Sequence, residues 1–168
     1  MKRPLVSVIM AAFNAEKTIR KSIESVLAQT YSNIEFIICD DGSVDGTVGI
    51  IREYPLIRCL SQNNQGHAAS RNNAVKLAMG EYLAFIDADD VWMPEKLEIQ
   101  IPLFEKKPTI GAVYSDMRLV DEKNQVLGYN AKGKMKRGYI FNDLISGNYM
   151  CGFSSLVVRM DVFKELGG

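Results

Sequence analysis

The sequence predicts one α/β domain built on a mostly parallel β-sheet that is flanked by helices. Three features of the chain indicate this class. Four short apolar runs alternate with segments of helical apolar spacing over the first ninety residues. Each run is nearly continuous, which is typical of strands buried on both faces. The chain has 168 residues, 47% of them hydrophobic, so it is long enough for one domain with a substantial core.

The first half is expected to alternate strands and helices. A strand over residues 5–11 opens the chain, and Asn14 is expected to cap a helix that runs through residue 29. Three further strands are predicted at residues 34–39, 57–60 and 82–86. Helices over about residues 47–53 and 68–79 connect them, and Gly80 is expected to stop the second of these helices. Strands joined in this way form parallel βαβ units.

The second half is less regular. Pro94 is expected to open a helix that carries Leu97, Ile101 and Phe104, with Pro102 as a kink. Three strands are predicted at residues 110–114, 116–120 and 154–159. A polar, glycine- and lysine-rich stretch covers residues 121–138, and short helices are expected at 139–145 and 161–166. No internal repeat or linker composition interrupts the chain, which favours a single domain.

Composition excludes some classes of function. Twenty basic residues balance twenty acidic ones, which argues against binding to nucleic acid. A local basic segment contains Lys132, Lys134, Lys136 and Arg137. We interpret it as a solvated loop, with contact to an anionic acceptor or to lipid head groups as the alternative. The three cysteines show no metal-binding spacing and favour a reducing compartment. The single histidine, His67, is interpreted as a helix-start residue rather than a catalyst.

Acidic residues follow two of the predicted strands. Asp40 and Asp41 follow the second strand, and Asp87-Ala88-Asp89-Asp90 follows the fourth. Because ligands of parallel sheets bind beyond the carboxyl ends of the strands, both groups are expected at one edge. Their oxygens suit Mg²⁺ or Mn²⁺, although an isolated acidic loop is usually just solvated. A negative pocket repels a bare phosphate and predicts a metal-complexed nucleotide diphosphate, whose base and ribose offer donors to free carboxylates.

Four sequence blocks in order resemble family 2 glycosyltransferases with the GT-A fold, a Rossmann-like α/β fold. These blocks are Val6–Asn14, Ser25–Tyr31 with Glu35–Ser43, Asn64–Gly66 with Ala69–Asn72, and Gly80–Tyr82 with Asp87–Asp90. The resemblance is strong over about residues 5–116 and weak beyond. It implies that residues 1–90 form a nucleotide-binding half and that residues 91–168 begin the acceptor-side half.

The resemblance also implies roles for matching residues. Ala11, Phe13 and Asp41 would contact the nucleotide base, with Asp41 accepting the uracil N3–H and Ala11 acting through its backbone. Asp40 would support the loop, and Arg71 would lie near the nucleotide or its phosphates. Asp87 would face the ribose or the metal, Asp89 would be the direct ligand of Mn²⁺ or Mg²⁺, and Asp90 would support them.

The implied activity is metal-dependent transfer, with inversion, from a nucleotide-diphosphate sugar, expected to be a UDP-sugar. The implied acceptor is a cell-surface polysaccharide or a lipid-linked saccharide. The general base is expected after Gly168, so the domain is expected to be incomplete at its C-terminus. The alternative is a module that binds the nucleotide sugar without catalysis. The implied location is the cytoplasm, with peripheral association at the inner membrane as the alternative.

Two other α/β classes fit the residues less well. A nucleotide-sugar pyrophosphorylase would need a glycine-rich basic loop after the first strand, where this chain has Ala11-Ala12-Phe13-Asn14. A receiver-like signalling domain would place acidic residues after the first strand, and none occurs there.

Overall fold

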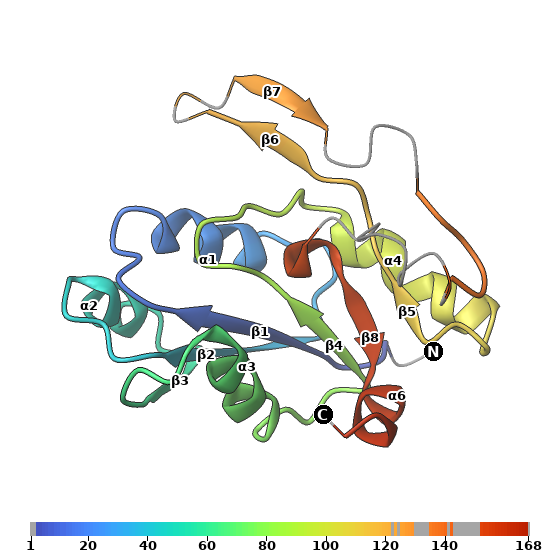
Figure 1. Cartoon of the computed structure of the whole chain (residues 1–168), viewed down its shortest axis with the longest axis horizontal. Coiled ribbons are helices and arrows are strands. Elements are labelled where there is room, and N and C mark those ends of the chain that lie inside the picture. Colours follow the sequence, from blue (N-terminus) through green and yellow to red (C-terminus); the bar gives the residue numbers. More distant parts are fainter. Residues whose placement is uncertain are drawn as a thin grey trace.

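A six-stranded sheet forms the centre of the protein (Figure 1). The computed structural model describes residues 3–121, 123, 125–129, 135–140, 142 and 152–167. The strands follow the order β3-β2-β1-β4-β8-β5. Their bounds are β1 Val6–Ala12, β2 Ile34–Asp40, β3 Arg58–Ser61, β4 Tyr82–Phe85, β5 Ala112–Val113 and β8 Val157–Arg159. The four strands of the first half are parallel, and β8 runs against its two neighbours. The predicted mostly parallel sheet is therefore confirmed.

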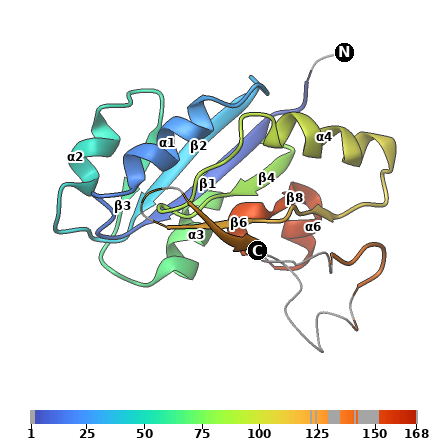
Figure 2. The same cartoon turned by 90° about the horizontal axis from the view of Figure 1, so that it is seen from above.

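Helices cover both faces of this sheet (Figures 1 and 2). They are α1 Ile19–Leu27, α2 Thr47–Arg52, α3 His67–Val75, α4 Lys96–Lys106 and α6 Met160–Glu165, with a 3₁₀ turn, η1, at Phe153–Ser155. Apolar residues of α1, α2 and α4 join one core cluster, and those of α3 and α6 join the other. The arrangement is a three-layer α/β/α domain.

Strand β1 lies between the two clusters, which explains its nearly continuous apolar sequence. Val6, Val8 and Met10 face the α1 side, whereas Ile9 faces the α3 side. All four are fully buried. Since successive side chains of a strand point to opposite faces, a strand covered on both sides is apolar at nearly every position. The one polar residue of β1, Ser7, is buried and donates its hydroxyl to Glu35 Oε1 at 2.6 Å.

Asn14 does not cap α1, so that prediction is wrong. Its φ of 48° is left-handed, and Thr18 occupies the N-cap position. The Asn14 side chain instead accepts the Val44 N–H at 2.9 Å, and its backbone N–H donates to Ser43 Oγ at 2.9 Å. Asparagine tolerates this conformation because its short side chain forms local hydrogen bonds. It joins the loop after β1 to the loop after β2.

The second half differs from the expectation in one element. Strands β6 Arg118–Val120 and β7 Val126–Tyr129 form an antiparallel hairpin, although residues 121–138 read as a polar stretch. Figure 1 shows this hairpin standing away from the sheet. The basic residues Lys132 and Lys134 and most of the predicted helix 139–145 lie outside the described residues. Within the described part, no helix has the length and apolar character needed to cross a membrane.

Candidate functional site

Three parallel strands bring the predicted site residues to one edge of the sheet. Phe13 follows β1, Asp41 follows β2, and Asp87 lies two residues beyond β4. Two adjoining pockets occur there. The first, of about 220 Å³, is lined by Ala11, Ala12, Phe13, Asp41, Asn64, Gly66 and His67. The second, of about 580 Å³, is lined by Ala11, Phe13, Asn14, Ala15, Glu16, Lys17, Thr18, Asp45, His67, Arg71, Asp87, Ala88 and Asp89. Every residue predicted to bind the nucleotide or the metal therefore lines one pocket or both.

Asp41 is buried beside the first pocket and holds the loop that precedes α3. Its Oδ1 accepts hydrogen bonds from Gln62 Nε2 at 2.7 Å and from the Gln65 N–H at 2.9 Å, and its Oδ2 accepts the Gly66 N–H at 2.8 Å. Burial alone would raise the pKa of Asp41, but these donors outweigh it and lower the pKa. The carboxylate is thus stabilised in its charged form.

Asp40 supports the turn on the other side of Asp41. It is 2% exposed, and its carboxylate accepts the Ser43 N–H at 3.3 Å. Gly42, in the turn between Asp40 and Ser43, has a φ of +83°, which glycine adopts without strain. An added Cβ there would lie 3.1 Å from the Gln62 carbonyl oxygen. The turn therefore packs tightly against the loop that Asp41 holds.

Arg71 and Asp87 form an ion pair in the second pocket. Arg71 projects from α3, and its Nη2 donates to Asp87 Oδ1. Its guanidinium lies 4.5 Å from the ring centre of Phe153, a favourable cation–π distance. Arg71 Nε is buried and has no hydrogen-bond partner among the described residues. The pair places one partly buried cation beside the acidic loop.

Negative charge accumulates in the loop at Asp87, Asp89 and Asp90. Burial raises the pKa of Asp90, as do the charges of Asp89 and Asp87, while a hydrogen bond from Ser154 opposes the shift. No group of three or more His, Cys, Asp or Glu side chains within the described residues is arranged to hold a metal ion. The carboxylates therefore form a partial oxygen ligand set, to which a ligand such as a diphosphate would have to add its own oxygens.

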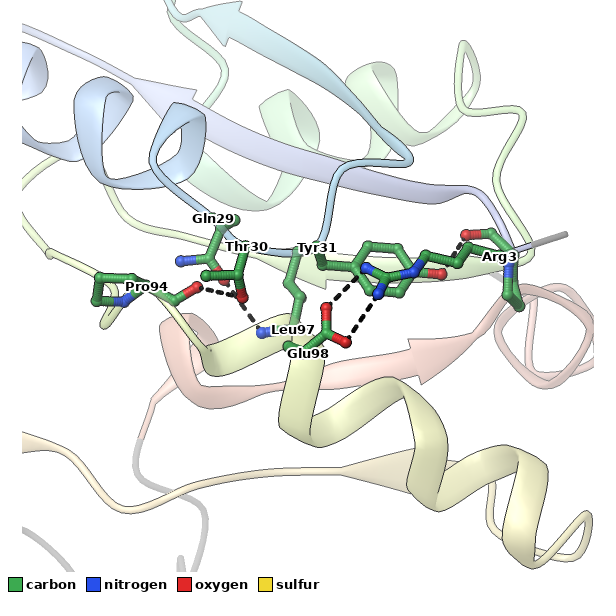
Figure 3. Close-up of polar contacts among 8 residues, drawn as sticks. Arg3, Gln29, Thr30, Tyr31, Pro94, Leu97 and Glu98 are labelled. Atoms are coloured by element: carbon green, nitrogen blue, oxygen red, sulfur yellow. Dashed lines mark hydrogen bonds and ion pairs between the residues drawn. The ribbon is translucent and has the colours of Figure 1, made fainter. Parts of the chain in front are cut away.

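The chain beyond the acidic loop is fixed to the end of α1 (Figure 3). Gln29 is 9% exposed, and its Nε2 donates to the Met93 carbonyl at 2.7 Å while its Oε1 accepts the Leu97 N–H at 3.1 Å. Thr30 donates its N–H to the Pro94 carbonyl at 3.0 Å. Because Gln29 satisfies one of the free donors at the start of α4, it fixes where that helix begins.

Trp92 follows the acidic loop and packs in the core. It is 5% exposed, and its backbone N–H donates to Ser25 Oγ at 3.1 Å. Its indole Nε1 donates to the Ser154 carbonyl at 2.8 Å. Trp92 thus packs in the core against the sheet and lines neither pocket.

Some lining residues were not expected. His67 starts α3, as predicted, but it also lines both pockets. Asn64 lines the first pocket, and its place as the first residue of the Asn64–Gly66 block was the available signal. Phe153 and Ser154 contact the Arg71–Asp87 pair from a distant part of the chain, and nothing in their local sequence indicates this.

Comparisons with known proteins identify the family of the chain. The family model described as Glycosyl transferase family 2 matches residues 7–167. The Escherichia coli UDP-Glc:alpha-D-GlcNAc-diphosphoundecaprenol beta-1,3-glucosyltransferase WfgD is 38% identical over 160 residues, which cover 94% of this chain and 60% of WfgD.

Two solved structures show the same fold. S. aureus TarS 1-349 in complex with UDP-GlcNAc has a TM-score of 0.75 at 22% identity, over 96% of this chain and 47% of that chain. The mannosyltransferase PcManGT from Pyrobaculum calidifontis, in complex with GDP-Man and Mn²⁺, has a TM-score of 0.74 at 22% identity, over 100% and 48%. The chain thus spans about half of each solved structure and 60% of WfgD. With the family model matched along nearly its whole length, the chain belongs to glycosyl transferase family 2 and has the GT-A fold.

Proposed function

We propose that the chain binds the UDP-sugar donor of a glycosyltransferase together with Mn²⁺ or Mg²⁺. The observation that carries the proposal is the convergence of Asp41, Arg71, Asp87 and Asp89 on two adjoining pockets at the carboxyl edge of the sheet. These residues come from two separate loops and one helix. Their carboxylates and guanidinium match the donors of a nucleoside and the charge of a metal-bound diphosphate.

The first pocket is proposed to hold the base. Asp41 is already fixed in its charged form by three donors, and carboxylate oxygens have further lone pairs for a base N–H. Phe13 is 49% exposed at the same pocket and offers a ring on which a base can stack. WfgD is named for a UDP-linked donor, which supports UDP as the nucleotide.

The second pocket is proposed to hold the diphosphate and the metal ion. Asp89 is exposed and free to turn toward an ion, and Asp87 adds a second oxygen ligand or contacts the ribose. Asp89 and Asp87 would hold the Mn²⁺ or Mg²⁺ ion, which would supply Lewis-acid chemistry to neutralise the leaving diphosphate. Arg71 adds a fixed positive charge on the same side and is held in place by Asp87 and Phe153.

The proposed reaction is transfer of the sugar to a saccharide or lipid-linked acceptor with inversion. The acceptor hydroxyl would attack the anomeric carbon from the face opposite the nucleotide, and the diphosphate would leave with the bonding electrons. We assign no residue of the described part as the base that takes the hydroxyl proton. Binding of the donor without transfer is thus the second candidate. A lipid-linked acceptor would place the reaction at the cytoplasmic face of the inner membrane.

Calorimetry with UDP-, GDP- and dTDP-sugars, in Mn²⁺ and in EDTA, tests the donor and the metal together. We expect UDP-sugars to bind more tightly than the other donors. In Mn²⁺, the affinity of Asp89→Ala for the UDP-sugar should fall to that of the unmodified chain in EDTA. Loss of one charged ligand should weaken binding by about tenfold or more. Glu105→Ala, an exposed acidic residue on α4, is the matched control. Equal UDP affinity with and without Mn²⁺ would contradict the metal assignment.

A turnover assay separates the two candidate functions. Transfer of sugar from the donor to any saccharide acceptor by this chain would exclude the binding-only alternative. Tight donor binding, with UDP released no faster than by hydrolysis of the donor sugar in the absence of the protein, would support the binding-only alternative.

A further inference from the structure

Ser154 contacts the acidic loop at both of its ends. Its hydroxyl oxygen accepts the Asp87 N–H at 2.9 Å, at the start of the loop. Its carbonyl accepts the Trp92 indole N–H at 2.8 Å, at the end of the loop. Ser154 is 3% exposed. The residues between these two contacts include Asp89 and Asp90, so one buried serine fixes the span of the whole loop.

The 3₁₀ turn that carries Ser154 also contacts the partner of Asp87. Phe153 lies under the Arg71 guanidinium, with 4.5 Å from Arg71 Cζ to its ring centre. The turn is itself held from α4, because Gln100 Nε2 donates to the Ser155 carbonyl at 3.1 Å. The turn η1 thus contacts both members of the Arg71–Asp87 ion pair while it is fixed to the helix on the α1 side.

We propose that Ser154 is a positioning residue that sets the spacing of Asp87 and Asp89 for the metal-bound donor. This inference rests on the proposed function, since it concerns the same acidic loop. Carboxylates of like charge repel one another, so an unrestrained loop would spread them apart. Ligand groups must be held within a fraction of an ångström of the binding geometry, and buried hydrogen bonds to their backbone provide that restraint.

Amide hydrogen exchange in the full chain, measured by NMR without nucleotide or metal, tests the restraint itself. Ser154→Ala should speed exchange of the Asp87 amide by about three- to tenfold, the effect of one lost hydrogen bond. Ser155→Ala is the matched control, because Ser155 is 1% exposed and its hydroxyl donates to the Gly152 carbonyl at 2.8 Å, away from the loop. Ser154→Thr keeps the hydroxyl and should restore slow exchange. Equal Asp87 exchange in the two alanine variants would overturn the proposal.

Calorimetry with UDP and Mn²⁺ then tests the consequence for binding. Ser154→Ala should weaken Mn²⁺-dependent UDP binding by about three- to tenfold, whereas Ser154→Thr and Ser155→Ala should stay near the unmodified chain. In EDTA all four proteins should bind UDP equally. An unmodified chain that binds UDP while Ser154→Ala binds it equally well would overturn the positioning role.

The two measurements separate the failure of this inference from that of the proposed function. If the unmodified chain binds no UDP in Mn²⁺, the proposed function fails and the role of Ser154 in donor binding fails with it. If it binds UDP and Ser154→Ala speeds Asp87 exchange without weakening binding, the proposed function stands and the positioning role alone is overturned. If Ser154→Ala does not fold, the exchange and affinity of Ser154→Thr test the role of the hydroxyl instead. Normal exchange and affinity in that variant support the role of the hydroxyl, and values unlike those of the unmodified chain contradict it.

Discussion

Both carboxylate oxygens of Asp41 accept hydrogen bonds from the loop before α3, while the same side chain lines the first pocket. Removing either oxygen therefore affects the fold and the pocket together. An asparagine keeps one acceptor but replaces the other by an NH₂ donor. In this site that donor would face the N–H of Gly66 or of Gln65, so two donors would meet without an acceptor.

Asp41→Asn should lower the free energy of unfolding by about 1–3 kcal/mol, the cost of leaving a buried donor unsatisfied. Thermal or denaturant unfolding measures this loss. Asp121→Asn is the control, because the recorded hydrogen bonds of Asp121 use Oδ1 alone, from the N–H groups of Lys123 and Gln125. Asparagine can reproduce both. Equal destabilisation by the two substitutions would show that the second oxygen of Asp41 contributes nothing.

The residues that a sequence can assign to this site are those that follow a strand directly. Phe13, Asp41 and Asp87 each come after an apolar run, and parallel strands end at the same edge, so their convergence is encoded locally. Ser154 and Phe153 were missed for the opposite reason. Their approach to Asp87 depends on β8 pairing antiparallel with β4, which no local pattern of residues specifies.

At the scale of elements, the strands of the first half were predicted to within one residue at each end, whereas the helix before β4 was not. Helix α3 ends at Val75 instead of residue 79. The backbone N–H of Met79 donates to Glu35 Oε1 at 2.6 Å, and that of Gly80 donates to Ser7 Oγ at 2.9 Å. These contacts with β1 and β2 draw the chain out of the helix, so tertiary packing overrides local helix propensity.

Strand β6 lies within the strand predicted at residues 116–120, but its partner β7 escaped prediction because it is short and polar residues surround it. Strand β7 has four residues, one of which is Gly128. A run of this length carries too little alternation to be distinguished from a loop. The length and burial of an apolar run therefore decide how well its strand can be read from the sequence.

Gly80 is the residue on which the packing of the α3–β4 connection depends. A Cβ at this position would lie 2.6 Å from Ser7 Oγ, 2.7 Å from Ser7 N and 2.8 Å from the Leu5 carbonyl oxygen. Two of these atoms belong to the backbone of β1 and its entry, so the sheet itself would have to move. Gly80→Ala should therefore cost about 1–3 kcal/mol of stability, as overpacking of a buried site does.

Gly49→Ala is the matched control for Gly80→Ala. Gly49 lies in α2, and an added Cβ there meets no described atom within 4 Å. Alanine favours a helix over glycine, so this variant should gain about 0.5–1 kcal/mol. Unfolding in urea compares the two. A stable Gly80→Ala protein would show that the β4 connection relaxes freely.

At the scale of the whole molecule, the site lies where the two helical layers meet the edge of one sheet. Ser25 of α1, Gln29 and Ser154 of η1 hold the acidic loop and the residues that follow it. Gln100 of α4 in turn holds η1. The α3 side supplies Arg71 and the loop bound by Asp41. Since both layers pack on the same strands, the geometry of the site depends on the stability of the entire domain.

That stability should depend on pH through Lys96, which is mostly buried on α4. Its Nζ lies 4.4 Å from the ring centre of Trp92 and donates to Gln100 Oε1 at 2.6 Å. Burial lowers the pKa of Lys96 to about 7, whereas a lysine in the unfolded chain has a pKa of about 10.4. Between these values the unfolded state binds more protons, so stability rises with pH. Burial raises the pKa of Cys39 to about 11, which has the opposite effect above about pH 8.5.

We therefore expect the free energy of unfolding to increase from about pH 7 to about pH 8.5, before the contribution of Cys39 begins to offset it. Urea unfolding followed by circular dichroism at a series of pH values measures this increase. Lys96→Met keeps the apolar stem and removes the titrating group, so it should raise stability at pH 7 and flatten the increase. Lys106→Met, an exposed lysine on the same helix, should keep the slope of the unmodified chain. An unchanged slope in Lys96→Met would mean that Lys96 stays protonated in the folded domain, and that its amine reaches water despite its position against Trp92 and Gln100.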